Sequence, residues 1–367
     1  MKYWRGYLIA AVMLIATWAM NQFAATHSKL VDMVYPYMTR LLQTNLAQWS
    51  SGVDFCLWQL LVLFGLVILL ASIVLMVIFH WNPVQWFGWV LAAFATVIML
   101  NMGMYGMNQH TLSIAEDVHL KTTDYSVTAL EAAAEYYLEQ ADTLAPQIAR
   151  DSSGNPKTLE FSALAEDAGE GFRTLTYEQE YPIFAGSLLP VKELGFTELY
   201  AGTTGKYFCL TGEATVNPNV PGVGLPFVIC EQMAHRMSIA REGDTAFAAF
   251  LACAFHSDVK FQYSGYLMAF RECYNALASL ETAAGKSAYQ RIDRQLKGKV
   301  ASDLQTYNSF LGSAANSYTD DCVYLLVNWH VQTVVLPSQN QEQDNVVLFD
   351  PLDETDERLS DLLKPTE

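Results

Sequence analysis

One stretch of the chain contains no charged side chain and is long enough to dominate how the protein can fold. No Asp, Glu, Lys or Arg occurs among the 61 residues from Phe55 to Ala115. A helix needs about 20 apolar residues to cross the hydrocarbon core of a bilayer. The stretch therefore has room for two crossing helices, predicted over residues 56–79 and 84–107, with the turn His80-Trp81-Asn82-Pro83 between them.

Residues 7–25 form another apolar run, preceded by Lys2 and Arg5. The run is long for a signal peptide and ends in a poor cleavage site, so we predict an uncleaved anchor. Lys2 and Arg5 crowd the N-terminus, whereas Lys29 and Arg40 are diluted over the following loop. The positive-inside rule therefore favours a cytoplasmic N-terminus. Three spans then predict a multi-pass protein of the cell membrane, in contact with the lipid bilayer and with its large domain outside the cytoplasm.

The loop between the first two predicted spans, residues 28–52, has apolar residues at helical spacing and a proline at Pro36. This pattern indicates an amphipathic helix that lies on the membrane or on the other domain. An ordinary surface helix gives the same pattern and stays an alternative. Residues 1–107 are thus interpreted as the membrane region.

The charge beyond the third span is strongly negative. The residues after 107 hold 17 Lys and Arg against 36 Asp and Glu, which argues against binding to nucleic acid or anionic lipid. Nine of the acidic residues fall in 341–367, which is interpreted as an acidic, loosely ordered tail. Five of the six cysteines also follow the third span. Because that number is odd and most of them lie in apolar segments, we expect buried free thiols.

Residues 108–340 are predicted to form one domain that is mainly α-helical and has a small sheet. The segment from Tyr207 to Val216 is rich in strand formers and is predicted to be a strand. Apolar periodicity elsewhere is helical, with helices expected at 124–150, 225–240, 244–256, 259–282, 285–296 and 313–336.

The most informative segment is the frame Glu231-Gln232-Met233-Ala234-His235. Zinc peptidases built on H-E-x-x-H place two histidine ligands four residues apart on one helix face, and the intervening Glu acts as general base on the metal-bound water. In this frame the second histidine is present as His235. The first histidine is replaced by Glu231, and the position of the general base is occupied by Gln232.

The surroundings of the frame resemble a bacterial membrane family known as domain of unknown function 3810, whose pattern is close to P-F-T-x-C-H-E-x-A-H-Q-x-G-x-A-R-E-x-E-A-N-F. The residues that match are Pro226, Phe227, Cys230, Ala234, His235, Ala240, Arg241, Glu242 and Phe247. Similar elements lie elsewhere, at Thr211-Gly212-Glu213-Ala214, Tyr263-Ser264-Gly265-Tyr266, Tyr35-Pro36 and Gly106-Met107-Asn108.

This resemblance implies a zincin-like α+β domain behind three transmembrane helices, with the family's third-ligand acid falling on Asp244. The expected metal set is then Glu231, His235 and Asp244, in which Asp244 begins a helix and turns back toward the other two. Gln232 cannot accept a proton from a metal-bound water, so the set is interpreted as vestigial. The resemblance, with these departures, implies either no cofactor or weakly bound zinc.

Each metal candidate also has a purely structural interpretation. His235 can be a hydrogen-bonded interior histidine. Asp244 can cap a helix N-terminus. Glu231 can be a buried acid paired with Arg236 or Arg241.

Two further residues are candidates for the cleft. Glu213, on the predicted strand, is the one acid that can replace the missing base. Tyr263 can face the cleft as a hydrogen-bond donor, although aromatic residues at this spacing more often pack in a core.

Three functions remain open from the sequence. The first is a membrane-anchored pseudopeptidase, not an active enzyme, that binds or scaffolds an extended peptide or protein partner. The second is a weakly active zinc metallopeptidase with a non-standard Glu/His/Asp site. The third is a structural membrane protein whose domain binds no ligand.

Overall fold

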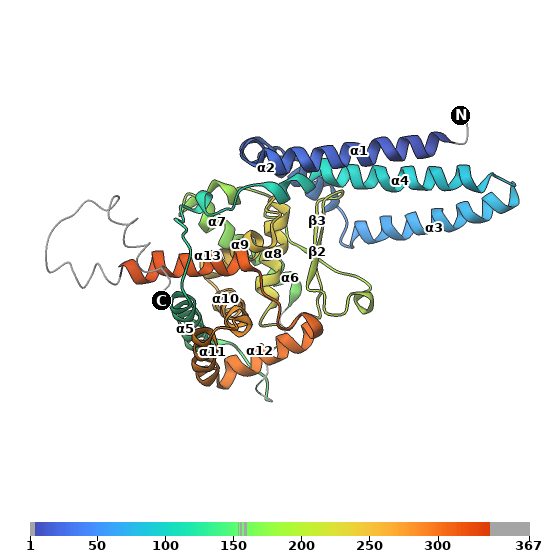
Figure 1. Ribbon diagram of the computed structural model, residues 1–367. Coiled ribbons are helices and arrows are strands. Elements are labelled where there is room, and N and C mark those ends of the chain that lie inside the picture. The colour runs from blue at the N-terminus through green and yellow to red at the C-terminus, as the bar shows by residue number, and fades with distance from the viewer. Residues whose placement is uncertain (1–3, 153, 155, 158–159, 338–367) are drawn as a thin grey trace, which may run out of the picture.

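A computed structural model describes residues 4–152, 154, 156–157 and 160–337. Three of its helices are long and apolar enough to cross a membrane: α1 (Arg5–Thr26), α3 (Leu57–Ile78) and α4 (Pro83–Met104). They extend together from one side of the remaining structure (Figure 1). The three apolar runs of the sequence are thus each one continuous helix, with Pro83 at the first turn of α4 where it removes no hydrogen bond.

Small residues bring α1 and α4 together. Gly6 lies so close to Gly88 that a Cβ atom on Gly6 would meet the Gly88 carbonyl carbon at 2.4 Å. Ala10, Ala92 and Ala95 continue the contact as a buried cluster. Close approach through Gly and Ala is how helices associate in a bilayer, where the hydrophobic effect does not drive one helix onto another.

Between the first two apolar helices the chain forms α2 (Ser28–Ser50), which contains Pro36. Figure 1 views α2 end-on while α1, α3 and α4 run across the picture, so α2 is steeply inclined to them. It packs on the remaining structure through Val31, Thr39, Gln43, Ala47 and Ser50.

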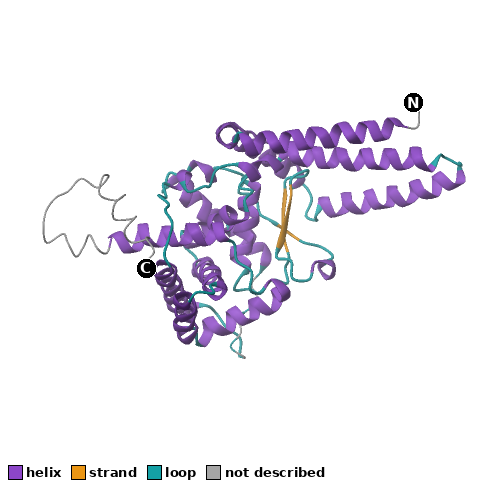
Figure 2. Ribbon diagram, in the orientation of Figure 1, coloured by secondary structure: helices purple, strands orange, loops and turns teal. Residues whose placement is uncertain are grey.

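The rest of the described chain is mainly helical with one small sheet (Figure 2). Strand β3 (Glu213–Val216) is central, β1 (Lys192–Glu193) pairs with it in parallel, and β2 (Gly205–Phe208) pairs with it antiparallel. The helices are α5 (Val127–Leu144), α6 (Phe161–Asp167), α7 (Gly169–Tyr177), α8 (Leu225–Arg236), α9 (Glu242–Ala254), α10 (Val259–Ser279), α11 (Ala283–Gln295), α12 (Gly298–Leu311) and α13 (Asp320–His330).

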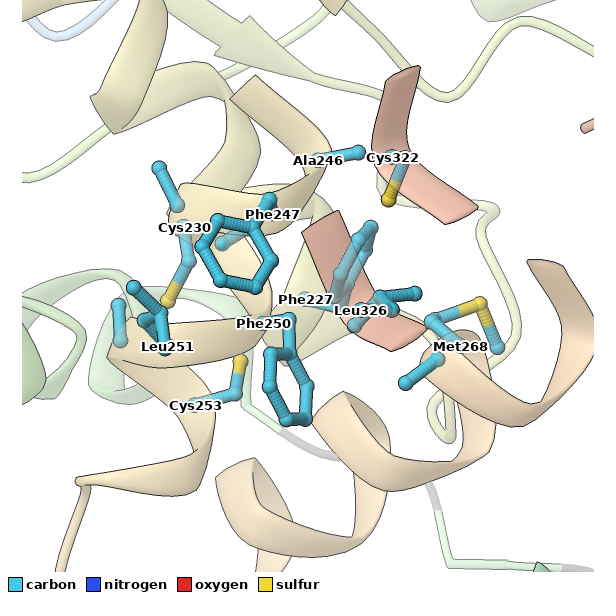
Figure 3. Packing of buried hydrophobic residues seen from close by; sticks show 14 of the residues in the cluster. Phe227, Cys230, Ala246, Phe247, Phe250, Leu251, Cys253, Met268, Cys322 and Leu326 are labelled. Atoms are coloured by element: carbon cyan, nitrogen blue, oxygen red, sulfur yellow. The ribbon is translucent and has the colours of Figure 1, made fainter. Parts of the chain in front are cut away.

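The core is centred on α9, which is buried on all sides. Every residue of α9 from Gly243 to Cys253 is buried, as expected of a helix that is apolar around its whole circumference. Figure 3 shows Phe247 and Phe250 of α9 interleaved with residues of α8, α10 and α13. All six cysteines are buried and free, which agrees with the expected thiols.

Two expectations about elements were wrong. The segment from Tyr207 to Val216 is a hairpin of β2 and β3 rather than one strand. Gly212 turns the chain with a φ of +67°, a conformation that L side chains rarely adopt. Helix α12 was not expected, and α13 begins at Asp320 rather than at 313. Helix α12 buries Val300, Leu304 and Tyr307, a short apolar stripe that is easily missed. The expected acidic tail, 341–367, lies outside the described residues.

Candidate functional site

Helix α8 carries the Glu231 to His235 frame and lies beside strand β2. A cavity of about 530 Å³ is lined by residues of both elements. Its walls also include the first turn of α3 and the residues that follow α4. The lining residues are Trp58, Tyr105, Gln109, Thr204, Gly205, Lys206, Tyr207, Phe208, Glu231, Gln232, His235, Ala240 and Glu242. We call this cavity the cleft.

Strand β2 borders the cleft and forms one edge of the sheet. Its inner side pairs with β3, and within the described part of the chain no strand pairs with its outer side. An unpaired strand edge presents N–H and C=O groups that an extended peptide can complete. The side chain of Lys206 projects from this strand and is exposed.

The His235 ring is held by a turn of its own chain. Its Nδ1 atom lies 3.2 Å from the carbonyl oxygen of Ile239, which also accepts a hydrogen bond from the Tyr105 hydroxyl at 3.2 Å. A carbonyl oxygen can only accept, so Nδ1 donates to Ile239 in the tautomer that carries the proton on Nδ1. In the other tautomer, Nδ1 can accept from the Tyr105 hydroxyl, which lies 3.3 Å away. The ring of Tyr207 stacks on the imidazole at 6.3 Å between centroids. In the neutral ring with the proton on Nδ1, Nε2 is an acceptor.

The Nε2 atom of His235 lies 3.9 Å from a carboxylate oxygen of Glu242 at the start of α9. Burial lowers the pKa of His235, although Glu242 and the Ile239 carbonyl act in the opposite direction. The imidazole is therefore neutral near pH 7.

Glu231 is partly buried one helical turn before His235. Burial raises its pKa to about 8, and the negative charges of Glu242 and Glu272 add to the effect against the opposing influence of Arg271. A carboxyl group with this pKa is mostly protonated at pH 7. The expected pairing with Arg236 or Arg241 is not found, because those guanidinium groups have other partners.

Arg236 points to the other side of α8, where it donates to the carbonyl oxygens of Ser187 and Leu189. Arg241 binds Asp321 at 2.5 Å. Glu231 thus has no arginine partner on its own helix or in the turn that follows it.

Gln232 is 4% exposed and packs under strand β2. A Cβ atom on Gly205 would meet the Gln232 Cγ atom at 2.7 Å, so the strand approaches the side chain as closely as glycine permits. Among the described residues, the Gln232 Oε1 atom has no hydrogen-bond partner. A buried amide oxygen without a partner is costly, and it is an acceptor that a bound donor can satisfy.

Asp244 lies away from the cleft. Its carboxylate accepts a hydrogen bond from the Ser113 hydroxyl at 3.0 Å and lies 3.7 Å from Arg241. It lines a second cavity, of about 550 Å³, next to α2. Burial raises its pKa to about 6. Nor does it cap the helix, since Arg241 occupies the N-cap position.

Glu242 is the acid that faces His235 in place of Asp244. Helix α9 begins at Glu242, and two positions along a helix of 3.6 residues per turn differ by about 200° in direction. Side chains at 242 and 244 therefore point to opposite sides. The signal that could have identified Glu242 is its place in the Ala240-Arg241-Glu242 match quoted above.

Glu213 is buried outside the cleft, at the start of α3. Its two carboxylate oxygens accept hydrogen bonds from the backbone N–H groups of Leu57 at 2.8 Å and Trp58 at 2.7 Å. Lys192 at 2.7 Å and Thr211 at 2.8 Å complete its partners. A carboxylate at a helix N-terminus satisfies free N–H groups and complements the helix dipole. This arrangement ties the sheet to α3.

Tyr263 lies in the core rather than in the cleft. It is 1% exposed, and its hydroxyl donates to Asp303 at 2.5 Å. Asp303 forms an ion pair with Arg150 at 2.7 Å. Tyr105 and Tyr207, which hold His235, were not identified from the sequence, because their role depends on which segments meet in the fold.

The side chains nearest His235 take part in separate contacts rather than gathering around one point. Among the described residues, no group of three or more His, Cys, Asp or Glu side chains is arranged to hold a metal ion. His235 and Glu242 approach each other, whereas Asp244 has partners elsewhere.

Comparison with known proteins identifies one family. The family model described as "Protein of unknown function (DUF3810)" matches residues 31–328. No curated protein and no solved structure matches the chain. The match covers most of the chain, including α3, α4, the sheet and the helices around the cleft. The chain therefore belongs to the family of proteins of unknown function DUF3810.

Proposed function

We propose that this protein is a membrane-anchored, zincin-like pseudopeptidase that binds an extended segment of a peptide or protein partner without cleaving it. The observation that carries the proposal is the buried, uncharged Gln232 in the base position, packed against β2, the strand whose outer edge is unpaired among the described residues.

The walls of the cleft suit an extended peptide. Strand β2 offers main-chain groups along its outer edge, and such groups supply much of the affinity when a peptide adds to a sheet. Gln232 lines the cleft, and its buried Oε1 atom has no hydrogen-bond partner among the described residues. Tyr207 and His235 form a stacked aromatic wall against which an apolar side chain of the ligand can pack.

Hydrolysis is not supported by the same residues. Gln232 cannot take a proton from an attacking water, and a positioned general base is typically worth about 10²–10⁴ in rate. The family's third-ligand position, Asp244, faces another cavity.

A weakly active zinc peptidase is the alternative function. The approach of Glu242 to within 3.9 Å of the His235 Nε2 atom favours it, because a small rotation would bring both onto one ion. Such a site would use Glu242 in place of the Glu/His/Asp set predicted from the sequence.

Binding can be tested with the full-length protein in lipid nanodiscs. A random dodecamer peptide library should yield binders, and Tyr207→Ala should weaken binding about 10-fold or more while the exposed Tyr177→Ala leaves it unchanged. If the wild type and Tyr207→Ala bound the peptides with equal affinity, the cleft would not be the peptide-binding site.

Strand addition can be tested on the same peptides. Successive residues of a strand present their N–H groups to opposite sides, so N-methylation of the bound peptide should abolish binding at alternate positions and spare the positions between. Uniform tolerance of N-methylation would exclude pairing with β2.

Metal content and cleavage of the bound peptides decide between the two functions, since chelator-sensitive cleavage by the wild type supports the alternative.

A further inference from the structure

Helix α2 packs on the protein through the face that has the smaller and more polar side chains. Thr39, Gln43, Ala47 and Ser50 are all buried. Gln43 is fully enclosed: its amide donates to the Met104 carbonyl at 3.1 Å and its oxygen accepts from the Tyr207 hydroxyl at 2.6 Å. A water-facing surface helix would bury its apolar side instead.

The opposite face of α2 is apolar and exposed. Tyr37 is 75% exposed and Met33 is 73% exposed. Residues spaced three and four apart extend this face along the whole helix. Its large apolar members are Leu30, Met33, Val34, Tyr37, Met38, Leu41, Leu42 and Trp49. The remaining exposed positions between them, Asn45 and Gln48, are uncharged. We call these eight side chains the apolar face of α2.

The depth of α2 is fixed by its hydrogen bonds to the last turn of α4. Tyr35 donates to the Met102 carbonyl at 3.0 Å, and Gln43 donates to that of Met104. Helices α3 and α4 each have 22 residues, which at 1.5 Å per residue matches the roughly 30 Å hydrocarbon core. The end of α4 therefore lies at the boundary between acyl chains and headgroups, and α2 lies beside it.

We propose that α2 is an in-plane membrane helix whose apolar face enters the lipid at the domain side of the bilayer. Its steep inclination to α1, α3 and α4 places it along the membrane surface rather than across it (Figure 1). Large apolar side chains are exposed on these three helices as well as on this face, so lipid is the occupant that covers all four elements at once. Helices of this kind bury their apolar side by about 5–10 Å into the boundary region.

A spin-label experiment on the full-length protein in nanodiscs tests this. Met38→Cys and Leu41→Cys place a nitroxide on the apolar face, and Ser287→Cys on α11 provides an exposed control on the side of the domain away from the three long helices (Figure 1). Leu66→Cys, in the middle of α3, marks the bilayer interior. The six native cysteines are buried, so background labelling should be low.

We expect oxygen, which concentrates in lipid, to reach the labels at 38 and 41 far better than a water-soluble nickel chelate does. The ratio of the two accessibilities should exceed that at Ser287 at least several-fold and lie below that at Leu66. A ratio equal to that at Ser287 would place the face in water and overturn the proposal. Exclusion of both reagents would overturn it as well, because it would mean that protein covers the face, either a second copy or a partner. All substituted side chains are solvent- or lipid-exposed, so folding should be preserved.

Discussion

His330 is a buried side chain whose ionisation opposes folding. It is 4% exposed, its ring lies 5.0 Å from that of Tyr136, and its Nδ1 atom has no hydrogen-bond partner among the described residues. Burial lowers its pKa to about 4. In the unfolded chain a histidine has a pKa of about 6.5, so between about pH 6.5 and pH 4 the unfolded state binds more protons than the folded state.

We therefore expect stability to fall as the pH drops through this range. The loss attributable to His330 should be about 1–2 kcal/mol between pH 7 and pH 5, and His330→Leu should remove that part of the pH dependence. Thermal unfolding in detergent at several pH values measures it. His27→Leu, at an exposed position, should keep the wild-type pH dependence. Identical pH profiles for the wild type and His330→Leu would contradict this assignment.

The residue that would serve as third metal ligand can be identified by rebuilding the family motif. Glu231→His restores the first histidine of H-E-x-x-H, Gln232→Glu restores the base, and His235 is already present. We expect this double variant to bind zinc. Adding Glu242→Gln should weaken zinc binding by more than about 100-fold, the upper end of the effect of losing an outer-shell partner. Adding Asp244→Asn should have little effect, because Asp244 faces Ser113 and Arg241.

Zinc content by elemental analysis and a competition titration measure these effects. The reverse ranking, with Asp244→Asn as the damaging change, would return the third-ligand role to Asp244 and imply that α9 rotates when metal binds. A double variant that gains no zinc would mean that the fold no longer supports a metal site at all.

At the scale of elements, the contact between β3 and α3 joins the domain to the membrane-crossing region. Glu213 is almost completely buried, and it satisfies two backbone N–H groups and the Lys192 ammonium together. Breaking one partner of such a buried pair leaves the other charge without compensation, which typically costs about 3–5 kcal/mol.

We expect Glu213→Gln to destabilise the protein by about 3 kcal/mol or more, because the amide removes the negative charge and can accept at only one atom. Thermal unfolding in detergent reports the loss. Glu193→Gln makes the same chemical change at an exposed position of the neighbouring strand and should be nearly neutral. Equal stability of the two variants would show that Glu213 does not anchor α3.

Helix α2 couples the membrane-crossing helices to the cleft at the element scale. Gln43 bridges the last turn of α4 and the Tyr207 hydroxyl, while Tyr105, directly after α4, contacts the turn that holds His235. The β2–β3 turn presses on α2, since a Cβ atom on Gly212 would meet the Ala47 nitrogen at 2.6 Å. The cleft is thus built partly from the elements that meet the bilayer, and its walls should loosen when these are removed.

For the whole molecule, the side of the membrane that holds the large domain is set by a few charges. Lys2 and Arg5 before α1, combined with three spans, predict that the domain lies outside the cytoplasm. Labelling of Ser287→Cys in intact cells by a membrane-impermeant maleimide should therefore succeed once any outer envelope is permeabilised. Protection of this cysteine until the membrane is lysed would reverse the topology.

Local sequence determined the long elements and the family. Runs of about 20 apolar residues with almost no charge favour helices that can cross a membrane, because backbone groups in lipid must bond to one another. The motif around α8 identified the family and placed Glu231, Gln232 and His235 on one helix. The boundaries at Gly212 and Gly298 were missed, since a single glycine marks a turn only where the fold requires a positive φ.

Tertiary structure alone decided which side chains meet. The start of α9 at Glu242 sets its helical phase, and that phase turns Glu242 toward His235 and Asp244 toward Ser113. Glu213 caps α3 because the fold brings the start of β3 next to the first residues of that helix. The backbone N–H groups of Leu57 and Trp58 donate to its carboxylate. The sequence also encodes that α2 is amphipathic, but only packing shows that its polar side faces the protein. Spacing along the chain fixes what lies on one face of one helix, whereas the rotation of each helix against its neighbours is set by the complete core.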